Sequence, residues 1–397
     1  MARIARMSRS HALVVTTLAG LAFLGVAASC SFTTSFDGIS GTRPADSGSP
    51  TESGSETGSA APPLRPAGTA APSGKGVSVW FGVKHYHFAH SNDALKVPGA
   101  WQDWGYDLDH LCTGEIEKDQ AGSCIRVPQE GVEQLKDGKS CRDNNFGSQI
   151  VPQLNVYKST FENDTNTGLA AGSPAWIFRL DDVDDGVDDP YVPGRLYVAG
   201  PTKSPAWDGT DSRDILPESV MGGDLDKPVV AFPKGYIRGN IWVSGEPSSF
   251  SISLPIGKTG ELLPMKVVST VIAFRLNETH GAVVDGTGVF AGAFAAADVE
   301  TFLKPFILTQ TSFCPGTTQY DDFVAKVKTF VDVVTESPTL QDPKINCTGI
   351  SFGIGINLAP VARPLKLAPS IPPTTSACDK GDAGSDSGDA ADGGVGD

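Results

Sequence analysis

The feature that most constrains the fold is a two-residue alternation of apolar with small or polar residues, which recurs through the middle of the chain. In SFSISLPIG every second residue from Phe250 to Ile256 is apolar, and GISFGIGINL repeats this from Ile350 to Leu358. Successive side chains of a strand point to opposite faces, so these segments predict half-buried β-strands. The pattern also occurs, bounded by Gly or Pro, at 76–83, 175–183, 194–200 and 235–245.

Two longer features predict how the strands pair. The apolar stretch 262–278 should return beside 249–257 as an antiparallel partner, and Asp285 and Gly286 stand between apolar arms as in a hairpin turn. Helical periodicity is confined to 297–304 and 319–334. The sequence therefore predicts a mainly β domain, an antiparallel sandwich or jelly roll, with one or two short late helices and disulfides to stabilise it.

The first 30 residues resemble an export leader. Arg3, Arg6 and Arg9 precede an apolar run over 12–28, which ends in VAASC. This ending resembles a lipobox, in which Cys30 would be lipidated and become the N-terminus. Alternatives are an ordinary signal cleaved nearby or an uncleaved N-terminal helix. Ser31 follows the cysteine in place of Asp, and the general bacterial sorting pattern then implies the outer membrane.

Composition divides the rest of the chain. Residues 30–75 are rich in Ser, Gly, Pro and Ala and predict a flexible tether, and 374–397 form an acidic tail that should be disordered. The mainly β domain is then expected over 76–373. Removal of residues 1–29 takes away three arginines and no acid, which changes the net charge from −15 to −18. Such an acidic chain is unsuited to binding nucleic acid.

Six cysteines remain beyond Cys30, an even number that indicates disulfides in an exported protein. Six cysteines allow fifteen pairings. Closeness in sequence favours Cys112 with Cys124 and Cys314 with Cys347, which leaves Cys141 for Cys378. The spacings include no CxxC motif, so a zinc ribbon is not expected.

Three of the six histidines lie together in KHYHFAH. On a strand, His85 and His87 would share a face, and His90 could return from the following turn to complete a metal site. The stretch is close to the HxHxDH motif of metallo-β-lactamase-like hydrolases, but Ala89 replaces its Asp. We therefore prefer an exposed, imidazole-rich strand end and keep a metal-dependent hydrolase as the alternative.

Acidic loops offer a second candidate metal site. GYDLDHLCTG contains Asp107 and Asp109, and DGKSCRDNN contains Asp143 and Asn144, in a region without regular hydrophobic periodicity. Calcium prefers carboxylate, amide and carbonyl oxygens, so these four residues are candidate calcium ligands. The alternative is ordinary turn chemistry, which also favours Asp and Asn. The aspartates of DDVDDGVDDP (181–190) are a weaker candidate.

Two other features have a structural and a functional interpretation. Trp101, Trp104 and Tyr106 could stack on a glycan, but core packing is the commoner role of such residues. Residues 349–353 spell GxSxG, yet the strand pattern continues through the motif and no histidine follows His280. We therefore expect core aromatics and no serine nucleophile.

The leader, SFDG (35–38), GYDLDHLCT, CRDNNFGSQIVP and the closing CTGISFGIGINLAPV together resemble uncharacterised secreted lipoproteins of myxobacteria. In these proteins the first motif tends to read DLDG-x-CT and the second G-x-DN, and His110 here stands where Gly is usual. The resemblance covers most of the predicted domain. It implies an outer-membrane lipid anchor and greater importance for the Asp and Asn loops than for the histidines. It implies no catalytic activity.

These observations predict a cell-envelope lipoprotein that displays a β-rich binding or structural domain. Its partners would be the membrane, through the lipid anchor, and a glycan or protein ligand. An enzyme is less expected than a binding or structural protein, and calcium is the expected cofactor if there is one.

Overall fold

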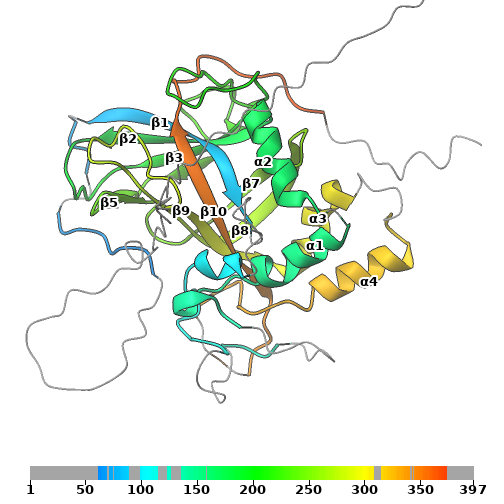
Figure 1. Ribbon diagram of the computed structural model, residues 1–397. Helices are drawn as coiled ribbons and strands as arrows, with labels where there is room; N and C mark the ends of the chain where they lie inside the picture. The colour runs from blue at the N-terminus through cyan, green and yellow to red at the C-terminus, as the bar shows by residue number, and fades with distance from the viewer. Residues whose placement is uncertain are drawn as a thin grey trace, which may run out of the picture. The chain divides into compact units, whose positions relative to one another are not determined.

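Ten strands form one antiparallel sheet in the computed structural model, which describes residues 61–68, 71–74, 76–88, 99–114, 123–126, 136–157, 159–307, 314–339, 342 and 344–372 (Figure 1). The strands are β1 (Val77–His87), β2 (Ala175–Val183), β3 (Gly194–Ala199), β4 (Val230–Phe232), β5 (Tyr236–Arg238), β6 (Ile241–Val243), β7 (Ser248–Ile256), β8 (Glu261–Arg275), β9 (Gly288–Ala295) and β10 (Gly349–Pro360). Their order is β4-β3-β2-β1-β10-β9-β8-β6-β5, and β7 also pairs with β8. The prediction of a mainly β, antiparallel fold is confirmed.

The sheet curls so that β7 lies against β2 across the core. Trp176 on β2 donates its indole N–H to the carbonyl of Ser253 on β7 at 2.7 Å, and its ring packs on Phe290 of β9. The fifteen-residue strand β8 allows this because it pairs with β7 along its first part and with β6 at its end. Its register with β9 shifts between Val268 and Val271, as at a β-bulge, which bends a strand.

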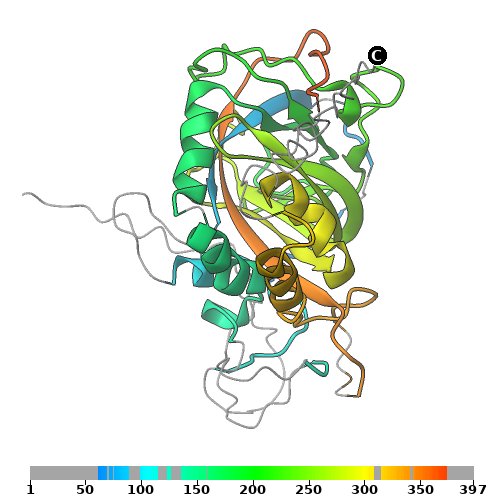
Figure 2. The ribbon, with the colours of Figure 1, turned by 90° about the vertical axis from the view of Figure 1, so that its right-hand side faces the viewer.

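Four α-helices accompany the sheet: α1 (Val151–Tyr157), α2 (Phe161–Ala171), α3 (Val299–Ile307) and α4 (Thr318–Val327). The two late helices, α3 and α4, were predicted, whereas α1 and α2 were not. Helix α2 contacts β1 and β7, and α3 lies against β8 (Figure 2). No helix in the described ranges is long and apolar enough to cross a membrane.

Strand β10 is buried on both faces, although its alternation predicted burial on one. Its large residues face the main core, and its glycines lie under the segment that precedes Asp107. A Cβ atom added to Gly355 would come within 2.4 Å of the Trp104 ring, and one on Gly353 within 2.5 Å of the nitrogen of Gly105. Residues 104–105 thus pack on the face of β10 that carries its glycines.

Part of the predicted tether contacts the domain, which corrects its boundary. The guanidinium of Arg65 lies 4.8 Å from the ring centre of Tyr236 and donates to the carbonyl of Pro190 at 2.6 Å. The hydroxyl of Tyr236 donates to the carbonyl of Pro63. Residues 61–68 therefore pack on the sheet through cation–π and backbone contacts. The predicted leader with Cys30 and the acidic tail 374–397 lie outside the described residues.

The hairpin predicted at Asp285 and Gly286 is wrong in its pairing. Gly286 has the positive φ, 74°, expected of a turn, but the nitrogen of Val284 donates to the carbonyl of Arg275 instead of pairing across the turn. Strand β9 begins only at Gly288.

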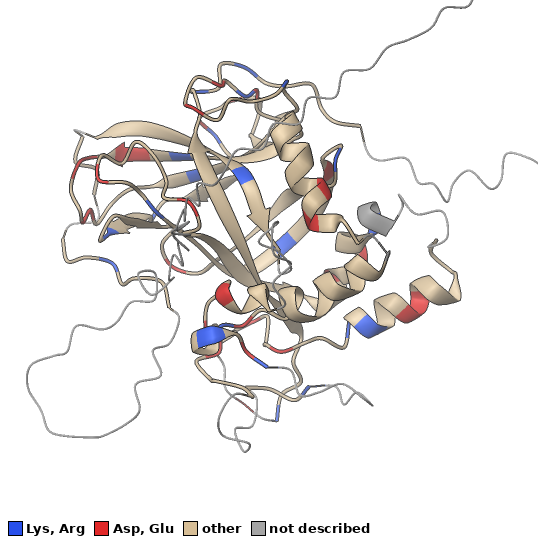
Figure 3. Ribbon diagram, viewed as in Figure 1, with Lys and Arg blue, Asp and Glu red and all other residues tan. Residues whose placement is uncertain are grey.

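Charged side chains are placed mainly on loops and helices, and β9 and β10 carry none (Figure 3). The centre of the sheet therefore provides an apolar support for the acidic loops beside it.

Candidate cation site

Two disulfides fix the loops that carry the candidate acids, in pairs that differ from those predicted. Cys112 is bonded to Cys141, and Cys124 is bonded to Cys347, 223 residues away. Cys314 is also disulfide-bonded, but not to Cys347. The predicted pairings Cys112–Cys124, Cys314–Cys347 and Cys141–Cys378 are therefore wrong.

Backbone pairing explains the true partners. The nitrogen of Ile125 donates to the carbonyl of Ile345 at 2.7 Å, and the nitrogen of Cys347 donates to the carbonyl of Ile125 at 2.9 Å, which places Cys124 beside Cys347. A second pair of segments meets where the nitrogen of Asp137 donates to the carbonyl of Thr113. Closeness in sequence cannot predict disulfide partners that are brought together by such tertiary pairing.

Three buried carboxylates converge between these loops. Asp107, Asp109 and Asp143 each place one carboxylate oxygen within 4.8 Å of the others. Asp107 is 7 % exposed, Asp109 0 % and Asp143 1 %. The Oδ1 atom of Asp107 is buried and has no hydrogen-bond partner among the described residues. A buried carboxylate oxygen without a partner is costly, so a bound cation would stabilise this atom.

Two further carboxylates surround this group. Asp137 accepts a hydrogen bond from the nitrogen of Thr113, and Asp332 accepts from both the nitrogen and the hydroxyl of Ser351 on β10. Asp332 is 2 % exposed and lies in the segment after α4. Asp332 was not predicted from the sequence, although a single acid between apolar residues in FVDVV was a usable indication.

Burial and mutual repulsion raise the pKa values of the cluster. Burial raises the pKa of Asp107 to about 7, and the charge of Asp109 adds to this effect. Burial likewise raises the pKa of Asp137 to about 8 and that of Asp332 to about 6. The pKa of Asp143 lies well above its ordinary value because of burial and the charges of its neighbours. The charge of Arg126 opposes this rise in the pKa values of Asp109, Asp137 and Asp332.

The central acids are held in place by their own loops. Asp143 Oδ2 accepts a hydrogen bond from the nitrogen of Leu108 at 2.7 Å, and Tyr106 pairs with Asp143 as an isolated antiparallel bridge. Asp109 Oδ1 accepts from the nitrogen of Leu111 at 2.9 Å. These contacts orient the carboxylates toward one another before any ligand binds, which is how a cation site is preorganised.

Asn144 was predicted as a calcium ligand, and the structure gives it another role. Its Oδ1 atom accepts hydrogen bonds from the nitrogens of Gly147 and Gly353, both at 2.9 Å. Its amide group donates to the carbonyls of Trp101, Trp104 and Gly353. Both lone pairs of its oxygen are used, so Asn144 clamps the loop to β10 and offers no ligand atom.

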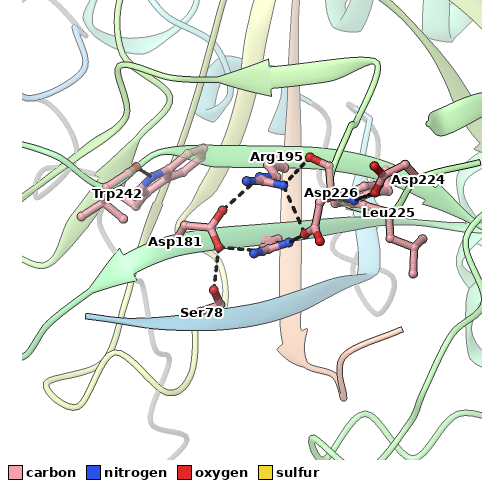
Figure 4. A network of polar contacts seen from close by, with 10 residues as sticks. Ser78, Asp181, Arg195, Asp224, Leu225, Asp226 and Trp242 are labelled. Atoms are coloured by element: carbon pink, nitrogen blue, oxygen red, sulfur yellow. Dashed lines mark hydrogen bonds and ion pairs between the residues drawn. The ribbon is translucent and has the colours of Figure 1, made fainter. Parts of the chain in front are cut away.

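The aspartates of 181–189 bind groups of the chain itself. Asp181 accepts from the hydroxyl of Ser78 at 2.6 Å and pairs with Arg179 at 2.6 Å and Arg195 at 3.0 Å (Figure 4). Both arginines also reach Asp226. This network spans β1, β2 and β3 and stabilises their pairing. Asp181 is therefore part of an ion-pair network.

Of the three histidines, two are described, and they converge. His85 and His87 on β1 each place a ring nitrogen within 4.8 Å of a carboxylate oxygen of Glu162 on α2. His90 lies outside the described residues. Glu162 was not predicted from the sequence, because FENDTNTG shows no pattern that distinguishes it.

Trp104 and Tyr106 are 6 % and 4 % exposed, which confirms their assignment to the core.

A separate cavity of about 530 Å³ lies between β3, β7, β8 and α3. Its walls are mostly apolar, with Val198, Ile252, Met265 and Phe302 among them. It shares no lining residue with the acidic cluster, and its shape and polarity suit a small hydrophobic ligand. Glu218, Lys266 and Asp298 also line it, and none of them belongs to a metal-ligating group found in the described part of the chain.

Comparison with known proteins gives no relative from which a function could be transferred. No family model, curated protein or solved structure matches this chain. The function must therefore be argued from the residues themselves.

Proposed function

We propose that the chain is an exported lipoprotein of the cell envelope, whose β-rich domain serves binding or structure and is organised by one calcium ion held by Asp107, Asp109 and Asp143. The observation that carries this proposal is the convergence of three buried carboxylates, one of which has an oxygen with no hydrogen-bond partner in the described part of the chain. Bringing like charges together in a buried place is unfavourable unless they are protonated or neutralised by a cation.

Calcium fits this donor set better than a transition metal. The three residues offer only carboxylate oxygens, and calcium takes 6–8 oxygen ligands at 2.3–2.6 Å in flexible geometry. Carboxylates bind in one- or two-oxygen modes, and backbone carbonyls or water would complete the shell. Zinc and copper favour nitrogen or sulfur ligands, which this cluster lacks.

The proposed location in the cell envelope is based on the sequence and is supported by the disulfides. Two disulfides between buried or half-buried cysteines are typical of oxidising compartments. The apolar run over 12–28 and the VAASC ending support lipidation at Cys30, and the likeness to myxobacterial lipoproteins supports the outer membrane. A Cys30→Ala variant should no longer be found in the membrane fraction of expressing cells. Unchanged membrane attachment of that variant would contradict the lipid anchor.

Calcium binding is tested by thermal unfolding of the full chain with its disulfides intact. After treatment with EDTA, the midpoint is measured with calcium, with magnesium or with neither. Calcium at 100 times its dissociation constant stabilises by about 2.7 kcal/mol. At about 2–4 °C per kcal/mol for a large domain, the midpoint should rise by roughly 5–10 °C. No rise with calcium, or an equal rise in Asp143→Asn, would exclude the site.

A further inference from the structure

A second constellation of metal-ligating side chains lies where β1 meets the start of α2. His85 and His87 alternate on β1 and so share a face of the strand, and Glu162 stands in the first turn of α2. One ring nitrogen of each histidine and one carboxylate oxygen of Glu162 lie within 4.8 Å of one another. Glu162 is 4 % exposed, while both histidines are half-buried.

Aromatic stacking fixes the two imidazoles. The ring of His87 lies flat on that of Trp104, with 5.0 Å between centroids and 11° between planes. Trp104 is in turn seated on Gly355 of β10, where no side chain larger than hydrogen fits. The rings of His85 and His87 are 4.4 Å apart. The imidazoles are therefore held by the core and do not splay outward.

Asn166 supports the same corner from α2. Its oxygen accepts from the nitrogen of Tyr86 at 2.8 Å, and its amide donates to the carbonyl of Tyr86 at 2.9 Å. Its amide nitrogen also lies 3.2 Å from Nε2 of His85. A metal ion bound at that nitrogen would replace this one contact, and Asn166 would keep both bonds to Tyr86.

We propose that His85, His87 and Glu162 bind one zinc ion at a site that shares no ligand with the calcium site. Two imidazoles and one carboxylate are a donor set that zinc prefers, with bonds of about 2.0–2.2 Å, and three protein ligands leave a fourth position open. The oxygen-only acidic cluster has the opposite preference. The chain would thus hold a hard and a borderline-soft cation at two sites of different chemistry.

The test is zinc binding by the full, oxidised chain with calcium at saturation, so that the acidic cluster is occupied. Competition with a chromophoric chelator should show one zinc per chain. Loss of an outer-shell partner alone usually weakens metal binding by about 10- to 100-fold, so Glu162→Gln and His87→Gln should each weaken it by at least about 100-fold. His110→Asn is the matched control, because His110 is exposed and Asn tolerates its left-handed backbone, φ 60°.

Two measurements keep the test decisive. Unfolding midpoints without zinc show whether a variant still folds, and the wild-type chain loaded with copper(II) should give an electron paramagnetic resonance spectrum split by two nitrogens. The spectrum should be unchanged in Asp107→Asn, which leaves both histidines in place. Absence of one-to-one zinc binding, affinity unchanged in both ligand variants, or coupling to fewer than two nitrogens would each overturn the proposal.

Discussion

Replacement of Asp107 by Asn should stabilise the calcium-free protein at pH 8 and lose most of this advantage when calcium is present. The carboxylate of Asp107 is 7 % exposed, and burial raises its pKa to about 7. Asn has nearly the same shape but stays neutral at every pH of interest. The variant therefore removes a calcium ligand and, at the same time, removes a charge that the folded protein accommodates poorly.

The sign and size follow from linkage. The folded state holds the proton of Asp107 more tightly than the unfolded state, whose pKa is about 3.9, so this stabilisation is complete below pH 4 and is lost as pH rises through 7. A difference of about 3 pKa units corresponds to roughly 4 kcal/mol at pH 8. In EDTA, Asp107→Asn should therefore be more stable than the wild type at pH 8 and about equal to it at pH 4.

Calcium should make this difference at pH 8 much smaller. An ion that binds the folded wild type at 100 times its dissociation constant contributes about 2.7 kcal/mol, whereas the variant has lost a ligand and should gain much less. Urea unfolding at pH 4 and 8, with EDTA or calcium, measures all the required free energies. Asp322→Asn, on the exposed face of α4, is the control and should change stability by no more than about 0.5 kcal/mol in each condition. A variant that is less stable than wild type in EDTA at pH 8 would refute the reasoning.

Three further predictions concern the loops around the cluster. Replacing both Cys112 and Cys141 by Ala opens a 29-residue separation and should cost roughly 4 kcal/mol in urea unfolding, with weaker calcium binding by calorimetry. Asn144→Asp turns the amide that faces three carbonyls into a carboxylate oxygen, so it should lower the free energy of unfolding by about 3 kcal/mol or more, whereas a calcium ligand would tolerate the change. His110→Gly should raise the free energy of unfolding slightly, by up to about 1 kcal/mol, because φ is 60° at that residue; a lower free energy would mean that its side chain matters more than its backbone.

The fold could be predicted from the sequence where the alternation is strong. Strands β2, β3, β7 and β10 occur close to their predicted positions, and β8 returns beside β7 as expected. Helix α2 could not be predicted, because it buries Glu162, Thr165 and Asn166 and so lacks an apolar stripe. Its polar residues are buried because their partners lie on β1 and in the turn after β7, which periodicity cannot reveal.

The candidate site could be predicted in part. Asp107, Asp109 and Asp143 stand in short motifs rich in Asp and Asn, and the structure brings them together. Asn144 belongs to the same motif but hydrogen-bonds β10, and a motif alone does not distinguish a ligand from a clamp. Asp332 lies almost 200 residues further along the chain and joins the cluster through its contacts with Ser351. Such long-range convergence depends on strand order, which local sequence does not contain.

The two proposed metal sites share a structural element, and this predicts that they are coupled. Trp104 stacks on His87 at one end of a short segment whose other end carries Asp107 and Asp109. Calcium that orders this segment would also fix Trp104 and with it the imidazole, so it should raise the affinity of the chain for zinc. Linkage requires zinc to raise the affinity for calcium by the same factor. Zinc titrations with and without calcium, and the reverse titrations, measure both factors. Equal factors above one would support the shared segment as the connection, whereas a factor of one in both directions would mean that Trp104 is already fixed by Gly355 without calcium.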